Sequence, residues 1–222
     1  MRRFAIYFAL PEYSPLNLMA SAWLGRSQME PPRNGFTPEV WGQVTSDPRV
    51  YGFHATLKPP FRLVAGRSEK ELFEKVQAFA KTQRAFTAPP LQVSAIASFL
   101  ALTLTEPCPT FEALAADCVR EFDEFRAPPS EEELDRRRRA KLNLKQLEYL
   151  TQWGYPYVME EWRFHMTLTS SLEKGLLERL RAHLENLFGD HCRKPTVVDA
   201  ICIFEQPAAG ELFHIAERFA FA

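Results

Sequence analysis

The stretch Tyr51-Gly52-Phe53-His54-Ala55-Thr56-Leu57 ends in a four-residue motif, His-Ala-Thr-Leu. The motif returns half a chain length later as His-Met-Thr-Leu, within Phe164-His165-Met166-Thr167-Leu168. Side chains alternate between the two faces of a β-strand, so each extended motif has His and Thr on one face. The Phe, the Ala or Met, and the Leu then share the opposite face. The pattern predicts two strands with a hydrophobic core behind them and a polar cleft in front.

The duplicated motif provides four polar side chains that meet at one point if the two strands are neighbours. His54 and His165 can then flank a phosphorus atom, and the hydroxyls of Thr56 and Thr167 can hold its oxygens. One imidazole acting as general base and one acting as general acid suffice for cleavage of a phosphodiester. The sequence leaves open which His is the base. The alternative is a pair of core histidines with local hydrogen bonds, but independent packing has no reason to repeat the motif.

The alternation extends the predicted polar face to three further residues. Lys58 and Arg163 share the parity of the two histidines, so we expect each to add a positive charge to the cleft. The alternative for Lys58 is a bend at the strand end, because Pro59 follows it. On the predicted first strand, Tyr7 lies on a face of small residues and either lines the cleft or is a buried tyrosine.

The composition is that of a globular protein. The 222 residues are 46% hydrophobic and include 18 Phe, enough to bury a core. The formal net charge is −1, whereas a protein that binds long nucleic acids is usually basic. A small phosphorylated ligand, or the end of a nucleic acid, therefore fits the charge better than bulk RNA.

Other sequence signals bear on compartment and metals. No hydrophobic run reaches the roughly 18 residues that cross a bilayer, and the start, residues 1–10, reads as a first strand rather than a signal peptide. The four Cys form no Cys-x-x-Cys pair, which predicts free thiols and a cytoplasmic location. Neither His motif carries a second ligand at zinc spacing, so we expect no metal and no cofactor.

An internal repeat organises the chain into approximate halves, residues 1–98 and 99–222. In each half the sequence predicts the element order β-α-β-α-β, with the His motif in the middle strand. Capping-box spacing, Ser68-x-x-Glu71 and Ser170-x-x-Glu173, predicts the helix after each motif. The expected fold is α+β: one bilobal domain over residues 1–222, with two lobes related by a pseudo-twofold axis, antiparallel or mixed sheets facing inward and helices outside.

An insert at residues 128–157 interrupts the second half. It contains the run Arg136-Arg137-Arg138-Arg139, which on its own suggests nucleic-acid binding. The pairs Glu132/Arg136, Glu133/Arg137 and Asp135/Arg139 have acid-first i,i+4 spacing, which favours a solvated helix instead. Because the insert leads into the second motif, it is also a candidate to cover the cleft.

The two His-x-Thr-Leu motifs resemble those of the 2H phosphoesterase superfamily. The longer strings Tyr51–Arg62 and Trp153-Gly154-Tyr155-Pro156-Tyr157 resemble a narrower, largely uncharacterised branch encoded in bacterial phosphonate operons. The resemblance implies metal-independent chemistry on cyclic phosphodiesters, with catalytic His54 and His165 and phosphate contacts from Thr56 and Thr167. The operon association implies a small cyclic sugar phosphate as substrate.

Two other functions remain open at this point. The first is binding of a nucleotide or cyclic phosphate without turnover, and the second is processing of RNA ends as a 2′-5′ phosphodiesterase or ligase. The net charge of −1 does not favour RNA as a partner.

Overall fold

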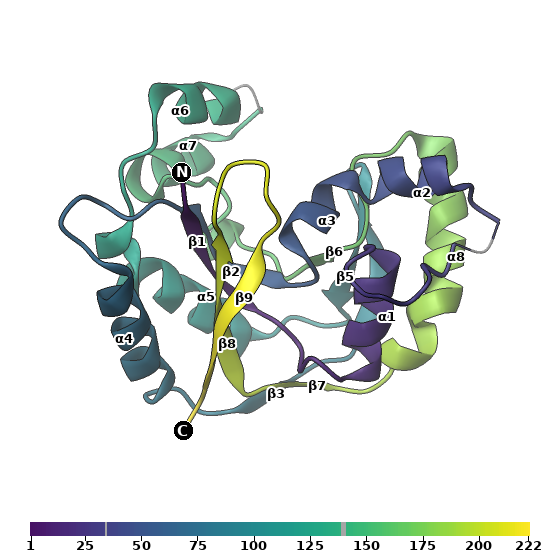
Figure 1. Cartoon of the computed structure of the whole chain (residues 1–222), viewed down its shortest axis with the longest axis horizontal. Coiled ribbons are helices and arrows are strands. Elements are labelled where there is room, and N and C mark those ends of the chain that lie inside the picture. Colours follow the sequence, from purple (N-terminus) through teal and green to yellow (C-terminus); the bar gives the residue numbers. More distant parts are fainter. Residues whose placement is uncertain (34, 139–140) are drawn as a thin grey trace.

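The computed structural model describes residues 1–33, 35–138 and 141–222, and the side chains of residues 136–138 lie outside the description. Its centre is a seven-stranded sheet in the order β4-β5-β6-β2-β1-β8-β9 (Figure 1). Every neighbouring pair in this sheet is antiparallel. The strands are β1 (Arg3–Phe8), β2 (Ala55–Phe61), β4 (Leu91–Ile96), β5 (Phe99–Leu104), β6 (Met166–Thr167), β8 (Ala200–Gln206) and β9 (His214–Ala220). A small second sheet pairs β3 (Phe86–Ala88) with β7 (Thr196–Val198).

Helices cover the sheet from outside, so the predicted α+β class is confirmed. Helix α8 packs against β4 and β5, α5 packs against β2, and α4 packs against β8 and β9. The helices are α1 (Pro15–Trp23), α2 (Pro38–Val44), α3 (Ser46–Tyr51), α4 (Glu69–Ala80), α5 (Pro109–Glu121), α6 (Glu131–Arg138), α7 (Leu144–Trp153) and α8 (Lys174–Cys192), with 3-10 turns at Asp123–Phe125 and Met159–Glu161. None of the helices in the described ranges is both long and apolar enough to traverse a bilayer.

The two sequence halves are interlaced in space. Strand β4 from the first half forms a hairpin with β5 from the second, and β8 from the second half pairs with β1. The boundary near residue 98 falls in the turn of the β4–β5 hairpin, where Ile96 pairs with Phe99. The repeat therefore describes the order of elements, while each end of the sheet is built from both halves.

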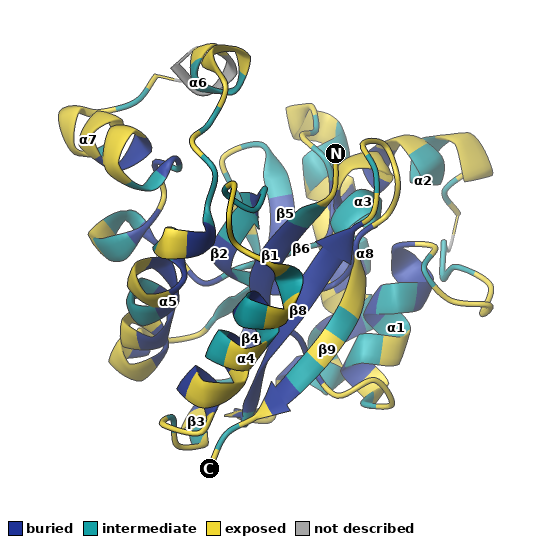
Figure 2. Ribbon diagram, turned by 60° about the vertical axis from the view of Figure 1, so that its left-hand side comes forward, coloured by how far each residue is buried: buried dark blue, intermediate teal, exposed yellow. Residues whose placement is uncertain are grey.

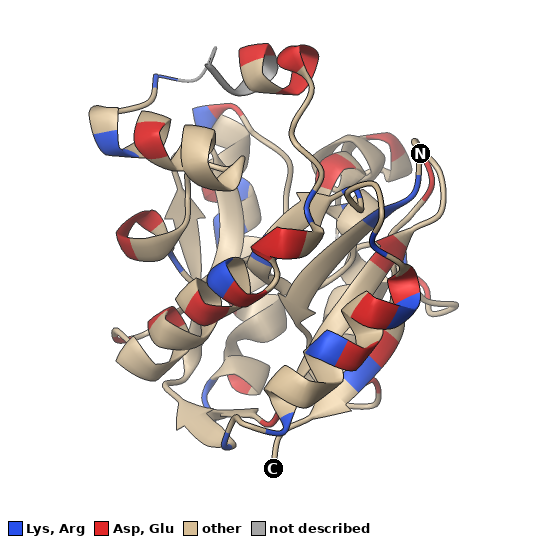
Figure 3. Ribbon diagram, turned by 90° about the vertical axis from the view of Figure 1, so that its left-hand side faces the viewer, with Lys and Arg blue, Asp and Glu red and all other residues tan. Residues whose placement is uncertain are grey.

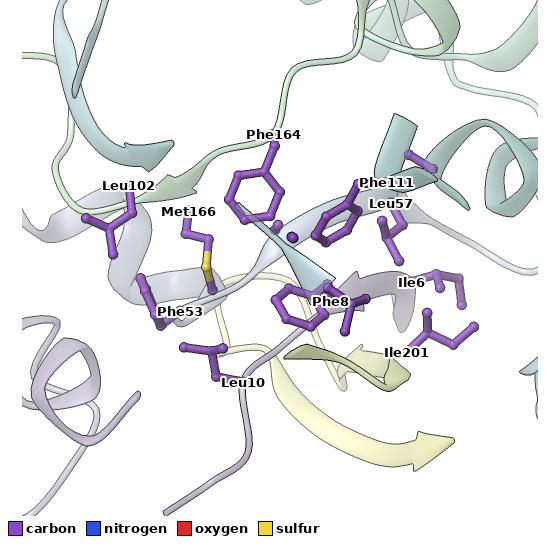
Figure 4. Packing of buried hydrophobic residues seen from close by; sticks show 14 of the residues in the cluster. Ile6, Phe8, Leu10, Phe53, Leu57, Leu102, Phe111, Phe164, Met166 and Ile201 are labelled. Carbon is purple, nitrogen blue, oxygen red and sulfur yellow. The ribbon is translucent and has the colours of Figure 1, made fainter. Parts of the chain in front are cut away.

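The core lies behind the two His motifs. Their apolar faces contribute Phe53, Leu57, Phe164 and Met166, each at most 8% exposed. Figure 4 shows these side chains gathered with Phe111 of α5 and residues of β1 and β5. In Figure 2 the central strands are buried, whereas α6 and α7 are largely exposed. Burial of the apolar faces fixes the orientation of both strands, because a one-residue slip would turn every side chain to the other face.

One of the two predicted capping boxes forms. The Ser68 side chain accepts from the Glu71 backbone, and the Glu71 side chain accepts from the Ser68 backbone, at the start of α4. The prediction at Ser170 is wrong, because α8 begins at Lys174 with no side-chain cap. The Ser170 hydroxyl instead accepts from the backbone of Asp47 at 3.0 Å, so it joins the start of α3.

The insert is tied to the body of the protein. The backbone of residues 125–127 runs beside residues 62–64, with Ala127 donating to the carbonyl of Arg62 at 2.7 Å. The predicted i,i+4 ion pairs of α6 involve arginine side chains outside the described residues. Glu133, one of their acidic members, bonds to Arg62 at 3.2 Å. All four Cys are free and buried, as the sequence predicts.

A β-bulge overturns the prediction for Lys58. Tyr7 pairs with Thr56 but Ile6 pairs with Lys58, so β2 holds an extra residue at this point. A bulge shifts the alternation of faces by one residue. Lys58 therefore points to the core side of the sheet, where its Nζ lies 3.0 Å from Asp123 Oδ1 and 3.2 Å from the carbonyl oxygen of Val119. It adds no charge to the cleft.

The buried ion pair between Lys58 and Asp123 leads to a prediction about stability. The side chain of Lys58 is 2% exposed, and breaking a buried pair by removing one partner costs about 3 kcal/mol or more. We expect Asp123→Ala to lose roughly that much free energy of unfolding in urea. The control is Asp117→Ala, which removes an exposed pair with Arg120 and should cost about 1 kcal/mol or less.

The double variant Lys58→Met/Asp123→Ala removes both charges and should recover part of the loss. Equal, small effects of Asp123→Ala and Asp117→Ala would contradict a buried Lys58 ammonium.

Candidate active site

The pairing of β2 with β6 brings the two His motifs together. Ala55 pairs with Met166 in an antiparallel register. Extending this register by one residue on each side places His54 opposite Thr167 and Thr56 opposite His165. The two histidines are then diagonal neighbours on one face, and the Cα atoms of such neighbours lie about 7 to 8 Å apart. That separation leaves room for a tetrahedral anion between the rings.

The exposure of the motif residues follows the predicted alternation. His54, Thr56, His165 and Thr167 are all half-buried, while the residues between them are buried. The structure therefore brings together all four side chains that the sequence singles out. The residues that flank them, Lys58 and Arg163, behave differently.

Each imidazole is oriented by a backbone carbonyl two residues upstream. His54 Nδ1 lies 2.9 Å from the carbonyl oxygen of Gly52, and His165 Nδ1 lies 2.8 Å from that of Arg163. A carbonyl can only accept, so both Nδ1 atoms carry a proton. In the neutral ring Nε2 is then unprotonated, which makes it available as a base. The hydroxyl of Thr56 lies 3.3 Å from His54 Nε2.

Gly52 has a backbone conformation that favours glycine. It ends α3 with φ of 79°, a left-handed conformation that favours glycine. This turn aims the Gly52 carbonyl at His54. The Gly in the Gly52-Phe53-His54 string is thus explained by the orientation of the imidazole.

Arg163 contributes its backbone to the site. Its guanidinium donates to the carbonyl oxygens of Glu160 and Trp162, at 2.6 and 2.7 Å. The expectation of an Arg163 charge directed at the histidines is therefore not supported by its contacts. The same side chain borders a cavity of about 450 Å³ between the end of β5 and residues 162–164.

Tyr7 is buried and also belongs to the site. It is 1% exposed, and its ring stacks on that of His54 with centroids 3.7 Å apart and planes at 16°. Burial raises the pKa of Tyr7, so its hydroxyl stays protonated. Tyr7 is therefore a buried tyrosine that also lines the site, because its ring packs against the imidazole of His54.

The insert approaches the site through Tyr155. After burial, the charges of Tyr51 and Tyr155 are the next causes of the raised pKa of Tyr7. Tyr155 packs near the cluster of Val119, Tyr149 and Val158, which joins the insert to α5. The insert therefore packs against α5.

Burial controls the protonation of both histidines. Burial lowers the pKa of His54 to about 3, with a smaller opposing effect of the Gly52 carbonyl and a further lowering by the charges of His165 and Arg26. Burial also lowers the pKa of His165, against the hydrogen bond to Arg163. Both imidazoles are thus neutral at pH 7 in the free protein. Negative charge placed between them would favour protonation of one ring.

Arg26 is a site residue that sequence reasoning missed. It donates to the carbonyl oxygens of Arg49 at 2.9 Å and Phe213, so it links α3 to the segment before β9. A Cβ at Gly52 would lie 3.7 Å from its guanidinium carbon. Arg26 follows α1 in a loop and belongs to no motif, and its partners are distant in sequence, so no local signal identifies it.

The hydroxyls of Ser94 and Thr103, near His165, were also not predicted from the sequence. Ala101 of β5 pairs with Thr167, which places Thr103 two residues along the same face. The Thr103 hydroxyl lies 2.8 Å from that of Ser94. Phe99, also on this face, lies 6.0 Å from His165 between ring centroids. Parity along a predicted β4–β5 hairpin is the signal that identifies these three.

The arrangement suits proton transfer across an anion. The β2–β6 register sets His54 and His165 on one face of the sheet, and the Thr56 hydroxyl lies 3.3 Å from His54 Nε2. Within the described ranges, no three or more His, Cys, Asp or Glu residues are grouped so as to hold a metal ion. The chemistry that these residues can perform themselves is general acid–base catalysis.

Comparisons with known proteins identify the family and the fold of this chain. A family model described as "Protein of unknown function (DUF1045)" matches residues 56–214. The Escherichia coli protein LigT complexed with 3′-AMP aligns with 100% of this chain and 98% of its own, at a TM-score of 0.50 and 14% identity. This likeness shows that the chain has the fold of LigT.

Two curated relatives share the name "Ribose 1,5-bisphosphate phosphokinase PhnN". The one from Janthinobacterium sp. (strain Marseille) is 38% identical over 232 residues, which cover 100% of this chain and 51% of the relative. The one from Laribacter hongkongensis (strain HLHK9) is 31% identical over 222 residues, which cover 96% and 50%. The chain thus spans about half the length of these relatives.

The lowered pKa of His54 predicts how stability depends on pH. Between its unfolded pKa of about 6.5 and its folded pKa of about 3, the unfolded state binds the proton and the folded state does not. The free energy of unfolding therefore falls as the pH drops below about 6.5. We expect urea unfolding to show a loss of roughly 1 to 2 kcal/mol from this residue between pH 7.5 and pH 5.

His54→Asn keeps a donor for the Gly52 carbonyl and removes the titrating ring. Its stability should decline less over the same pH interval than that of the wild type. The interval ends at pH 5 so that carboxyl groups contribute little. Parallel declines in the two proteins would contradict a low pKa at His54.

Proposed function

The chain belongs to the DUF1045 family, and we propose that it is a metal-independent phosphodiesterase that opens a small cyclic sugar or nucleotide phosphate. The proposal rests on one observation: the β2–β6 register sets His54 and His165 diagonally across a single space. Two imidazoles on one face, each oriented by a backbone carbonyl at its Nδ1, suit acid–base catalysis of a displacement at phosphorus. The fold shared with LigT supports a phosphoesterase-type enzyme.

In the proposed mechanism His54 is the general base and His165 the general acid. His54 is stacked on Tyr7 and its Nδ1 donates to the Gly52 carbonyl, so its Nε2 is oriented to accept a proton from water as the water oxygen attacks phosphorus. The anionic diester favours protonation of His165, and its Nε2 gives that proton to the leaving alkoxide. One P–O bond forms, the ring P–O bond breaks, and the product is a phosphomonoester.

The hydroxyls of Thr56 and Thr167 hold the non-bridging oxygens. They lie on the same face as the histidines and on opposite strands, so they can contact the phosphoryl group from two sides. Ser94 and Thr103 provide further hydroxyls beside His165. Hydrogen bonds to the oxygens that gain charge in the transition state lower the barrier.

The names of the relatives favour a ribose phosphate as substrate. Those proteins are named for ribose 1,5-bisphosphate, a phosphomonoester of the kind that opening of a cyclic ribose phosphate gives. This chain contains no Gly-x-x-x-x-Gly-Lys-Ser/Thr loop, the signature of a P-loop kinase. We therefore assign it the phosphodiesterase step rather than the phosphokinase activity of the relatives' name. LigT complexed with 3′-AMP supports a nucleoside phosphate as the other substrate class.

The charge distribution makes RNA a weaker candidate than a small molecule. Figure 3 shows acidic and basic residues interspersed on the outer helices of the described chain. RNA binding is usually driven by a continuous basic surface. Binding of a cyclic phosphate without turnover remains the other class of function, and the same kinetic experiment distinguishes it.

Replacement of either histidine should abolish most turnover of the cyclic substrate. Loss of one acid or base typically lowers the rate about 10²- to 10⁴-fold. His54→Asn and His165→Asn retain a donor for the upstream carbonyl and lack Nε2, so they remove the chemistry with little change of fold. The matched control is His183→Asn on α8, whose Nε2 lies 3.1 Å from the carbonyl oxygen of Pro32.

The assay follows the release of phosphomonoester from a panel of ribose and nucleoside cyclic phosphates in buffer that contains EDTA. Turnover in EDTA that falls in the two motif variants and persists in the control supports the proposal. Turnover that needs an added metal contradicts the mechanism. Binding without turnover in the wild type contradicts the enzymatic function and favours a cyclic-phosphate-binding protein.

A further inference from the structure

A group of basic side chains lies beside the start of β1. Three arginines, Arg3, Arg62 and Arg126, border one recess. Arg3 lies on β1, Arg62 directly follows β2, and Arg126 lies just before the insert. The other residues around the recess are Pro60, Phe61, Ala127, Pro129, Glu133 and Gly154.

Two of the three guanidiniums are already paired. Arg126 donates to both carboxylate oxygens of Asp123, at 2.7 and 3.1 Å. Arg62 lies 3.2 Å from a carboxylate oxygen of Glu133. Arg3 instead donates from Nε to the neutral amide oxygen of Gln206 at 2.7 Å, and within the described residues no carboxylate pairs with it. Arg3 therefore has a positive charge available for an anionic ligand.

Arg3 lies on the same face of the sheet as the active site. Strand β1 pairs with β8 without a register shift, so Arg3 and Tyr7, four residues apart, point the same way. The rise of a strand places their Cα atoms about 13 Å apart. The Arg3 guanidinium lies over the ring of Phe213, 5.4 Å from its centroid.

A row of aromatic rings continues from Arg3 to the catalytic histidine. The Phe213 centroid lies 6.4 Å from that of Tyr7, and the Tyr7 centroid lies 3.7 Å from that of His54. Burial is the main cause of the raised pKa of Tyr7, and the positive charge of Arg3 acts in the opposite direction. The contacts with Phe213 thus link the Arg3 guanidinium to the aromatic rings beside His54.

We propose that Arg3, at the recess shared with Arg62 and Arg126, binds a second phosphate of the substrate while the two histidines act on the cyclic one. The proposal rests on the phosphodiesterase function and specifies its substrate class: a sugar with a cyclic phosphate at one end and a phosphomonoester at the other. Glu133 and Asp123 offset the charges of Arg62 and Arg126, so the attraction for an anion comes from Arg3. Arg3 forms the direct contact, because its fork of N–H donors matches phosphate oxygens.

The experiment compares ribose 1,2-cyclic phosphate with its 5-phosphorylated form. A charge-assisted contact to phosphate should raise kcat/KM for the phosphorylated substrate about 10- to 100-fold in the wild type. Arg3→Gln should reduce this ratio to near one, and Arg3→Lys should retain part of it. The control is Arg2→Gln, whose side chain binds Glu69 and Glu205 and should leave the ratio unchanged.

Two results overturn the inference while the phosphodiesterase function stands: a wild-type ratio of one, or a ratio that Arg3→Gln does not alter. If the wild type turns over neither compound, the proposed function fails and binding decides the inference. Calorimetry then compares the affinity for ribose 5-phosphate of His54→Asn and of the His54→Asn/Arg3→Gln double variant. A loss of at least 10-fold in the double variant supports the subsite, and equal affinities refute it.

Discussion

The short antiparallel contact between β2 and β6 is the constraint on which the site depends. Strand β6 has two residues, and its register with β2 is set by the single pair Ala55 and Met166. Buried side chains behind the two strands keep this register, since a slip of one residue would put Phe53 and Phe164 in the cleft and the histidines in the core. The same contact joins the two ends of the seven-stranded sheet, so fold and catalytic geometry are specified together.

The site keeps His54 neutral and oriented in the free protein. Burial keeps His54 neutral, and stacking on Tyr7 together with the Gly52 carbonyl fixes the direction of its Nε2. In the proposed mechanism an anionic substrate between the rings favours protonation of His165. Binding and protonation are then coupled, as suits a general acid that is charged only when substrate is present.

The sequence predicts the elements set by local periodicity and misses those set by distant partners. Alternation over five residues was enough to place His54, Thr56, His165 and Thr167 on one face. The bulge that turns Lys58 into the core depends on how β1 fits beside β2, which no pattern within β2 reveals. Arg26 and Arg3 act through carbonyls, an amide and rings far away in the chain, so their roles follow only from the fold.

The central claim, that two imidazoles share one anion site, is tested most directly by NMR of ¹⁵N-labelled histidine during titration with inorganic vanadate, a phosphate mimic. The account predicts that the Nε2 signals of His54 and His165 shift together with a single dissociation constant, and that neither shifts when the other residue is replaced by Asn at the same vanadate concentration. Signals that respond separately, or a response at one histidine alone, would contradict the shared site.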